Sequence, residues 1–359
     1  MCCIQSALRV VITITIARLT SRHSVLAYAA GKLIMKKILF IVFAVVFFLG
    51  AIAVVFRLPL VLFAISLQDT PPLLDKLALS AAERWFDDYY TVEEISPNTF
   101  AIGEPRYYQK NYSYLLLGDT QALLFDSGTP VRNIAPVVAS LTDKPVTTIA
   151  SHLHYDHVGN HHRFSSVAML DTAQTREQMV DGWFSPKNYQ HLGYLEKFPA
   201  PSWHVSRWLQ SGQVIDLGNR KITVIATPGH TDQSVSLMDV EQNLLFTGDF
   251  IYNGPLYAFF ANSNLKDYLQ SSQNLLSKTN RKTRFFAAHR SVNKATPALP
   301  SQDLPSQDIS LQDLSDLKTT LTHIKGQTAV RAGIFPAAWT INEKLSILTD
   351  MPWLLDWQD

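Results

Sequence analysis

The sequence has almost no cysteine: Cys2 and Cys3 are the only two in 359 residues. The rest of the chain therefore has no disulfide framework and no thiolate ligands, and any metal site must be built from histidine and carboxylate. The formal net charge is only +1. This balance excludes the basic surface of a nucleic-acid-binding protein, so we expect no nucleic-acid partner. The 47% hydrophobic content supports a sizeable core, in one large domain or two small ones.

A long uncharged apolar run covers residues 38–56. At about 1.5 Å per residue it is long enough to cross about 30 Å of hydrocarbon as a helix. Lys32, Lys36 and Lys37 precede it. By the positive-inside bias they would keep the N-terminus in the cytoplasm, so we expect a membrane-anchored protein whose catalytic domain is periplasmic or otherwise extracytoplasmic.

We predict that residues 35–67 form this anchor, as an uncleaved signal-anchor. A cleaved signal is the alternative, because 51–53 and 64–66 resemble weak cleavage sites. Met35 is a natural start for such a segment, so residues 1–34 are interpreted as an extension from a misassigned start codon.

Histidine and aspartate are concentrated in Ser151-His-Leu-His-Tyr-Asp-His157. This cluster directly follows residues 145–150, a β-branched run that is typical of a buried strand. Imidazole and carboxylate are the ligands that zinc takes, and the spacing of His152 and His154 places both rings on one side of an extended backbone. Asp156 and His157 follow on a turn and are placed for a second ion. An ordinary polar loop is the alternative, but it gives no reason to crowd protonatable rings.

Three more predicted strands end next to residues of the same types. They cover 221–226, 244–247 and 284–288, and they are followed by His230, Asp249 and His289. Each residue alone is more typical of a turn or a cap. Together they complete the ligand set that the first cluster begins.

Short strands and a helix precede the first cluster. Strands are predicted at 99–102, 113–117 and 122–125, with a hairpin turn at 118–121, and a helix at 131–141. A polar cluster at the carboxyl end of a strand is where layered α/β folds bind their ligands.

The domain boundaries follow from these patterns. We predict a connector helix over 68–90, because apolar residues recur there at three and four positions, and a catalytic domain over 91–359. An aromatic insert at about 172–212 is either a lid over an apolar pocket or a helical segment packed on the domain. A Ser/Leu-Gln-Asp recurrence leads to a predicted helix at 311–324, and the sequence assigns no role to 290–359.

These motifs resemble those of the metallo-β-lactamase-fold hydrolase superfamily, over roughly residues 91–290. The resemblance implies an α/β fold, an αββα four-layer sandwich with a dinuclear metal site at one edge. It implies that one metal is held by His152, His154 and His230, and that the other is held by Asp156, His157 and His289. It also implies that Asp249 bridges the two metals and that Asp126 orients the site from behind.

The resemblance implies a dinuclear zinc hydrolase, with iron or manganese as alternatives. Two such ions share a water and lower its pKa, so that a bridging hydroxide attacks the substrate. Asp156 and Asp249 are the predicted catalytic carboxylates. Tyr252 is at the position where related lactonases have a tyrosine that contacts the substrate carbonyl, although a single aromatic residue at this spacing is more typical of a core or lid tyrosine.

Aromatic residues around the motifs favour a small-molecule substrate with an apolar acyl part: a carboxylic ester, lactone or thioester. A phosphodiester would call for arginine or lysine, and Arg163, Arg207 and Arg290 are the candidates near the motifs. Asp249 and the lack of a cysteine ligand disfavour β-lactamase activity, and the sequence at 250–257 departs from glyoxalase II enzymes. Phosphodiesterase or β-lactamase activity, a non-catalytic metal-binding scaffold and a two-iron redox protein are the alternatives. The sequence does not define an oligomeric state.

Overall fold

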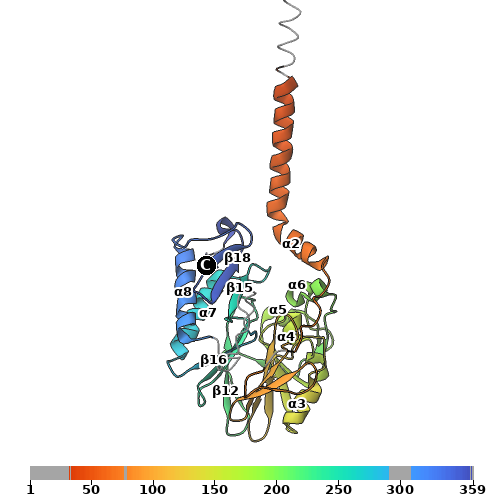
Figure 1. The fold of residues 1–359 in the computed structure, drawn as a ribbon, viewed down its shortest axis with the longest axis vertical. Coiled ribbons are helices and arrows are strands. Elements are labelled where there is room, and N and C mark those ends of the chain that lie inside the picture. The colour runs from red at the N-terminus through yellow and green to blue at the C-terminus, as the bar shows by residue number, and fades with distance from the viewer. Residues whose placement is uncertain (1–31, 33, 77–78, 291–308, 356, 358–359) are drawn as a thin grey trace, which may run out of the picture. The chain divides into compact units, whose positions relative to one another are not determined.

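The computed structural model in Figure 1 describes residues 32, 34–76, 79–290, 309–355 and 357. The chain divides into two units, 1–61 and 62–359, and each is described by itself. The proposed extension at 1–34 lies outside the described residues except for Lys32 and Ile34. Most of the Ser/Leu-Gln-Asp recurrence also lies outside them.

The first unit contains the helix Ile34–Val55, whose most apolar window has a mean hydropathy of 3.2 with no part buried. By length and composition it can cross a membrane, and a signal sequence would meet the same criteria. A second apolar helix, α2 (Arg57–Ser66), follows.

The catalytic unit is built around two large sheets. Strands β1 to β5 of the first sheet run antiparallel, and β5, β6, β7 and β10 run parallel. Within the described residues the order of this sheet is β1 (Arg84–Trp85), β2 (Thr91–Ser96), β3 (Thr99–Gly103), β4 (Tyr112–Leu117), β5 (Ala122–Phe125), β6 (Val146–Ile149), β7 (Ser166–Leu170) and β10 (Arg207–Leu209).

The second sheet is antiparallel except for the parallel pair β14 and β16. Its order is β11 (Val214–Asp216), β12 (Lys221–Ala226), β13 (Val235–Asp239), β14 (Leu244–Gly248) and β16 (Arg284–Ala287). Two smaller sheets are formed by β15 (Gly254–Ala258), β18 (Leu345–Thr349) and β17 (Ala337–Thr340), and by β8 (Trp183–Phe184) and β9 (Trp203–His204).

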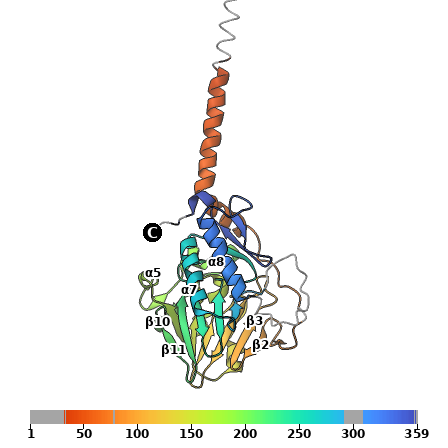
Figure 2. The same ribbon diagram turned by 90° about the vertical axis from the view of Figure 1, so that its left-hand side faces the viewer.

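Three apolar layers hold these elements together, which confirms the αββα sandwich. Phe125 of the first sheet and Phe246 of the second belong to the core between the sheets. On the outer side of the first sheet, α3 (Ala135–Leu141) adds Val137 and Val138 to a second core. On the outer side of the second sheet, α7 (Leu265–Lys278) and α8 (Leu311–Lys325) form a third. Figures 1 and 2 show α7 and α8 side by side, on the side of the sheets opposite to α3. Because both faces of β4, β5 and β14 are covered, every residue of these strands is buried.

The remaining helices are short. They are α4 (Tyr155–Val158), α5 (Ala173–Glu177) and α6 (Asn188–His191), with 3₁₀ turns at His161–Arg163, Gly193–Glu196 and Pro352–Leu354.

The predicted connector helix over 68–90 is wrong. Its described part, 68–76 and 79–90, contains no α-helix, and its one strand is β1. Pro71 and Pro72 disfavour a helix. The backbone N–H of Leu74 donates to Arg106 O at 2.7 Å, and Arg106 Nε donates to Leu74 O at 2.8 Å. The backbone groups of Leu74 therefore form hydrogen bonds with a distant residue, although the apolar spacing predicted a helix here.

The other predictions agree closely with the structure. The strands before the ligand residues and the helix at 311–324 are present, and the helix predicted at 131–141 begins only at Ala135. In the aromatic insert, Phe184 and Trp203 are buried in a core that includes Leu153, whereas Trp183 and Tyr189 are 52% and 40% exposed. The insert is thus packed on the domain through some of its rings and exposes others.

Candidate metal centre

Strand ends bring the predicted ligands together. In the second sheet Gly248 pairs with Ala287 across the parallel strands β14 and β16, so Asp249 and His289 emerge side by side. In the first sheet Phe125 pairs with Ile149, so Asp126 and the 151–157 loop emerge side by side. Ser151 O accepts from Val235 N at 2.7 Å, which joins the two sheets at this edge. Gly248 has a φ of +54°, and a Cβ there would lie 2.5 Å from Ser151 Cβ, so the approach requires glycine.

The first ligand group consists of His152, His154, His230 and Asp249. His154 Nδ1 lies 2.8 Å from His152 Nε2 and 3.2 Å from His230 Nε2. All four side chains are buried, with 7% exposure or less. Three inward-facing imidazole nitrogens and one carboxylate are a donor set that suits a tetrahedral zinc ion.

The second ligand group consists of Asp156, His157 and His289. Asp156 Oδ2 lies 3.3 Å from His157 Nε2 and 3.6 Å from His289 Nε2. His157 Nε2 and Asp249 Oδ1 are buried and have no hydrogen-bond partner among the described residues. Buried polar atoms without partners that converge on one point fit a metal ion.

Asp249 contacts both groups. Its Oδ2 lies 3.9 Å from His152 Nε2 and 3.8 Å from His230 Nε2, whereas its Oδ1 lies 3.0 Å from His289 Nε2 and 3.4 Å from His157 Nε2. Oδ2 also lies 3.2 Å from His289 Nε2. The carboxylate therefore lies between the two groups, with Oδ2 beside histidines of both.

Hydrogen bonds at the far side of the rings set which nitrogen faces the centre. His157 Nδ1 donates to Asp126 Oδ2 at 2.9 Å, His230 Nδ1 to Tyr257 O at 2.6 Å, and His289 Nδ1 to Gln109 O at 3.0 Å. Each of these bonds leaves Nε2 directed at the metal groups, as in other metal-binding histidines. Asp126 also accepts from Ser151 N at 2.6 Å, so it orients the ligand loop as predicted.

The charge around the histidines differs between the groups. Burial lowers the pKa of His152 and His154 well below the ordinary histidine value, which keeps both rings neutral. Burial also opposes protonation of His157, but Asp156 and Asp249 outweigh it and raise the pKa of that ring. Burial would raise the pKa of Asp249, yet His289 and His157 hold it well below its usual value. The second group therefore pairs ionised carboxylates with histidines whose pKa is raised, whereas the rings of His152 and His154 are neutral.

The sequence interpretation missed two residues that support the second group. Asn111 Nδ2 donates to Asp156 Oδ2 at 2.9 Å, and Gln109 supplies the carbonyl that accepts from His289. Both residues lie just before β4, at the amino end of a strand. The sequence feature that could have identified them is a polar residue directly before a strand that is apolar and buried throughout.

Aromatic side chains pack against the histidines of the first ligand group. The Phe260 ring packs edge-on against His154 and His230, with centroid distances of 5.4 Å and 6.2 Å. Phe259 and Tyr257 in turn pack on Phe260, at 4.8 Å and 6.1 Å. The predicted apolar wall therefore lies next to the metal centre.

Tyr252 is 2% exposed and its ring packs on His289 at 5.1 Å. Its hydroxyl donates to Pro255 O at 2.5 Å. Contact between this hydroxyl and a substrate would require that bond to break.

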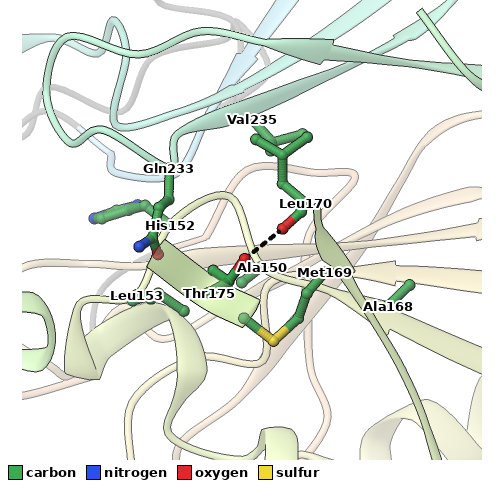
Figure 3. A pocket seen from close by; sticks show the side chains of 9 residues that line it. All are labelled: Ala150, His152, Leu153, Ala168, Met169, Leu170, Thr175, Gln233 and Val235. Atoms are coloured by element: carbon green, nitrogen blue, oxygen red, sulfur yellow. Dashed lines mark hydrogen bonds between the residues drawn. The ribbon is translucent and has the colours of Figure 1, made fainter. Parts of the chain in front are cut away.

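A small pocket borders His152 and is shown in Figure 3. It is mostly apolar, with Met169 and Leu153 among its walls and the Gln233 amide at the His152 side. Thr175 Oγ1 donates to Leu170 O at 3.0 Å along one edge.

The remaining histidines of the described chain are outside both groups. His161 is fully buried, lies 2.7 Å from Ser127 Oγ through Nδ1, and has its pKa lowered to about 3 by burial. His191 is buried in the insert, and His162, His204 and His323 are exposed. This agrees with their exclusion from the ligand set.

With its αββα sandwich and paired ligand groups at one edge, the chain belongs to the metallo-beta-lactamase superfamily, whose family model matches residues 109–288. It is a hydrolase of that superfamily. The acyl-coenzyme A thioesterase MBLAC2 of Gallus gallus is 28% identical over 220 residues, which cover 54% of this chain and 77% of the relative. A hydroxyacylglutathione hydrolase of Dictyostelium discoideum is 21% identical over 188 residues, covering 50% and 62%. The solved structure of a metallo-beta-lactamase from Pontibacter korlensis has 16% identity and a TM-score of 0.45, and the match covers 65% of this chain and 99% of that one.

Proposed function

We propose that this protein hydrolyses carboxylic esters, lactones or thioesters of apolar acyl groups and that it holds two zinc ions. The position of Asp249 carries the two-metal part of the proposal, because its carboxylate lies beside both ligand groups, 3.9 Å from His152 Nε2 and 3.0 Å from His289 Nε2. His152, His154 and His230 would hold one ion, and Asp156, His157 and His289 the other. A donor set of imidazole and carboxylate without thiolate suits zinc.

When bound, such metals supply Lewis-acid polarisation of the carbonyl and a water of lowered pKa. The residues of the chain supply the rest. Neutral His152 and His154 present lone pairs at Nε2 and Nδ1, and Asn111 holds Asp156 Oδ2 in place. Asp156 and Asp249 are the carboxylates positioned to accept a proton from the attacking water. No serine or cysteine nucleophile is required.

The wall of rings supports an apolar acyl part. Phe260 covers two ligands of the first group, so an acyl chain whose carbonyl is at the metals would lie against this ring. The thioesterase relative supports a thioester bond in particular, since a chain 28% identical to this one is named for hydrolysis of acyl-coenzyme A.

The arginines near the motifs offer little to a phosphodiester. Arg290 Nη1 lies 3.5 Å from Glu83 Oε2, and Arg163 Nε donates to Asn160 Oδ1 at 2.8 Å. These contacts turn both guanidinium groups toward other side chains, and an anionic phosphate would require such groups at the metals.

A substrate panel on the zinc-loaded protein tests the proposal. It compares acyl thioesters and p-nitrophenyl esters of increasing chain length with an acyl-homoserine lactone, bis-p-nitrophenyl phosphate and a cephalosporin. We expect kcat/KM to rise by about fourfold per methylene buried, from about 0.8 kcal/mol each. Phe260→Ala should flatten this dependence, and Trp353→Ala, which removes a ring 60% exposed, should not.

Two results of the panel would contradict the substrate class. Turnover of the phosphodiester alone would exclude acyl transfer, and rapid cephalosporin hydrolysis would show that Asp249 does not disfavour β-lactams. Full activity after removal of metal would contradict the metal-dependent mechanism itself.

We also propose that the helix Ile34–Val55 remains uncleaved, spans a membrane and places the catalytic domain outside the cytoplasm. The basic residues Lys36 and Lys37 at its start support this orientation. A reporter fused after residue 90 should be active only in the exported compartment, and protease added to spheroplasts should reach the domain. Protection of the domain would overturn the orientation.

A further inference from the structure

We propose that Glu196, in the aromatic insert, is a positioning residue for the second ligand group. The inference rests on the proposed two-metal function and adds to it a residue that lies outside the superfamily motifs. Glu196 is the last residue of the 3₁₀ turn Gly193–Glu196, and it is 8% exposed. A buried carboxylate is costly unless donors surround it.

Three tyrosine hydroxyls donate to this carboxylate. Tyr107 donates to Oε2 at 2.6 Å, and Tyr108 and Tyr155 donate to Oε1 at 2.5 Å and 2.6 Å. All three distances lie at the short end of the range for hydrogen bonds between oxygens. Glu196 therefore holds together three side chains that come from two segments far apart in the sequence.

Both segments lead directly to ligands of the second group. Tyr155 lies between the ligands His154 and Asp156, at the start of α4, which carries Asp156 and His157. The other segment continues from Tyr108 to Gln109, whose carbonyl accepts from His289 Nδ1 at 3.0 Å. Gln109 Nε2 also donates to the Tyr155 hydroxyl at 2.8 Å. One carboxylate thus orders the two loops that position Asp156, His157 and His289.

The backbone around Glu196 is also fixed. Lys197 has a left-handed φ of +63° and caps the turn. Its backbone N–H donates to Tyr194 O at 3.3 Å, and the N–H of Phe198 donates to Gly193 O at 2.9 Å. Lys197 Nζ pairs with Asp69 Oδ1 at 2.7 Å, and Thr70 Oγ1 donates to Glu196 O at 3.3 Å. The chain that leads into the domain therefore holds the insert where Glu196 reaches the tyrosines.

The first ligand group serves as an internal control. Two of its rings have other partners, since His152 Nδ1 lies 3.0 Å from Ser151 Oγ and His230 Nδ1 donates to Tyr257 O. His154 directly precedes Tyr155, so loss of Glu196 should weaken the second metal site more than the first. Removal of a group that orients metal ligands typically lowers metal affinity or activity about 10–100-fold.

Zinc titration against a competing chelator tests this inference, with zinc alone as the probe. The variants are Glu196→Ala, Glu196→Gln and Tyr155→Phe, and the control is Glu177→Gln, an exposed glutamate of the same insert. We expect the weaker zinc site of Glu196→Ala to shift by about 10–100-fold, with a smaller shift at the tighter site. Glu196→Gln and Tyr155→Phe, which each keep part of the network, should shift less.

Activity against an ester should follow the zinc titration. In Glu196→Ala, kcat should fall at limiting zinc and recover with added zinc, and KM should stay the same. A merely structural role would lower the activity at every zinc concentration. If Glu196→Ala does not fold, as judged by circular dichroism, Tyr155→Phe and Glu196→Gln carry the same test.

The outcomes separate this inference from the proposed function. A wild-type protein with two zinc ions, together with folded Glu196 variants that titrate like Glu177→Gln, would overturn the positioning role alone. A fully active wild-type protein with one zinc ion would overturn both the two-metal proposal and this inference.

Discussion

The two ligand groups lie side by side and share Asp249, yet their histidines are held in opposite ways. In the first group, burial lowers the pKa of His152, His154 and His230, so these rings are neutral donors. In the second group, burial also opposes protonation, but Asp249 raises the pKa of His289. The difference follows from where carboxylates lie, because all of these side chains are equally buried.

This contrast suggests different dependence on supporting residues. A neutral imidazole group requires little beyond correctly placed rings. A group with Asp156, Asp249 and Asp126 around His157 concentrates negative charge, and it depends on a cation and on orienting hydrogen bonds.

Asp249→Ala should have the largest effect, because it is the one change that removes a ligand from both groups. We expect activity to fall by more than about 100-fold, since the loss of a ligand should exceed the 10–100-fold typical of its hydrogen-bond partners. Activity assays and zinc content measure this, with the exposed Asp143→Ala as control. Normal zinc content with full activity would show that Asp249 bridges nothing.

Asp126→Asn should affect the second group alone. Its amide oxygen can still accept from Ser151 N, but its NH₂ group would then face His157 Nδ1–H, donor against donor. His157 would adopt the tautomer with the proton on Nε2, which cannot bind a metal. We expect loss of about 10–100-fold in affinity for one zinc ion. Asp143→Asn is the matched control, and equal loss at both sites would contradict the separation of the groups.

His161 tests whether position or carboxylates determine the histidine pKa. It lies near the second group but bonds to Ser127 and no carboxylate, and burial lowers its pKa to about 3 from the usual 6.5. Its unfolded form binds a proton first as pH falls, so stability is complete above pH 6.5 and is lost toward pH 3. We expect a slope of up to about 1.4 kcal/mol per pH unit in the free energy of unfolding.

Urea unfolding at several pH values measures this slope. His161→Asn should lose it, while His323→Asn, on the exposed face of α8, should keep it. A parallel pH dependence in wild type and His161→Asn would show that His161 is not the group responsible.

Tyr252→Phe should have the smallest effect, below about threefold in kcat, or roughly 0.6 kcal/mol. The variant keeps the ring against His289 and removes a hydroxyl that donates to Pro255 O. A hydroxyl that stabilised the reacting oxygen would instead be worth about 100-fold or more. A loss of that size would restore the predicted contact between Tyr252 and the substrate carbonyl.

The sequence alone predicted the side chains that the structure brings together in the two groups, and most strands of the sandwich. This was possible because each ligand follows a strand with a continuous apolar run, as at 221–226 before His230 and 284–287 before His289. A buried strand followed by a histidine or aspartate can be recognised from a stretch of about ten residues, because the apolar run and the polar residue are close together in the sequence. The αββα arrangement came from the resemblance in these motifs, and the core clusters confirm it.

Only the tertiary structure decided what supports these ligands. Asn111 and Glu196 act across 45 and 41 residues, on Asp156 and Tyr155, and no local pattern reports a partner so far along the chain. The helix predicted at 68–90 is wrong for the same reason. The spacing of its apolar residues is typical of a helix, but Leu74 forms a backbone hydrogen bond with Arg106. Local spacing records which face of a segment is apolar, whereas the partner of a polar group depends on which loops the folded sheets bring together.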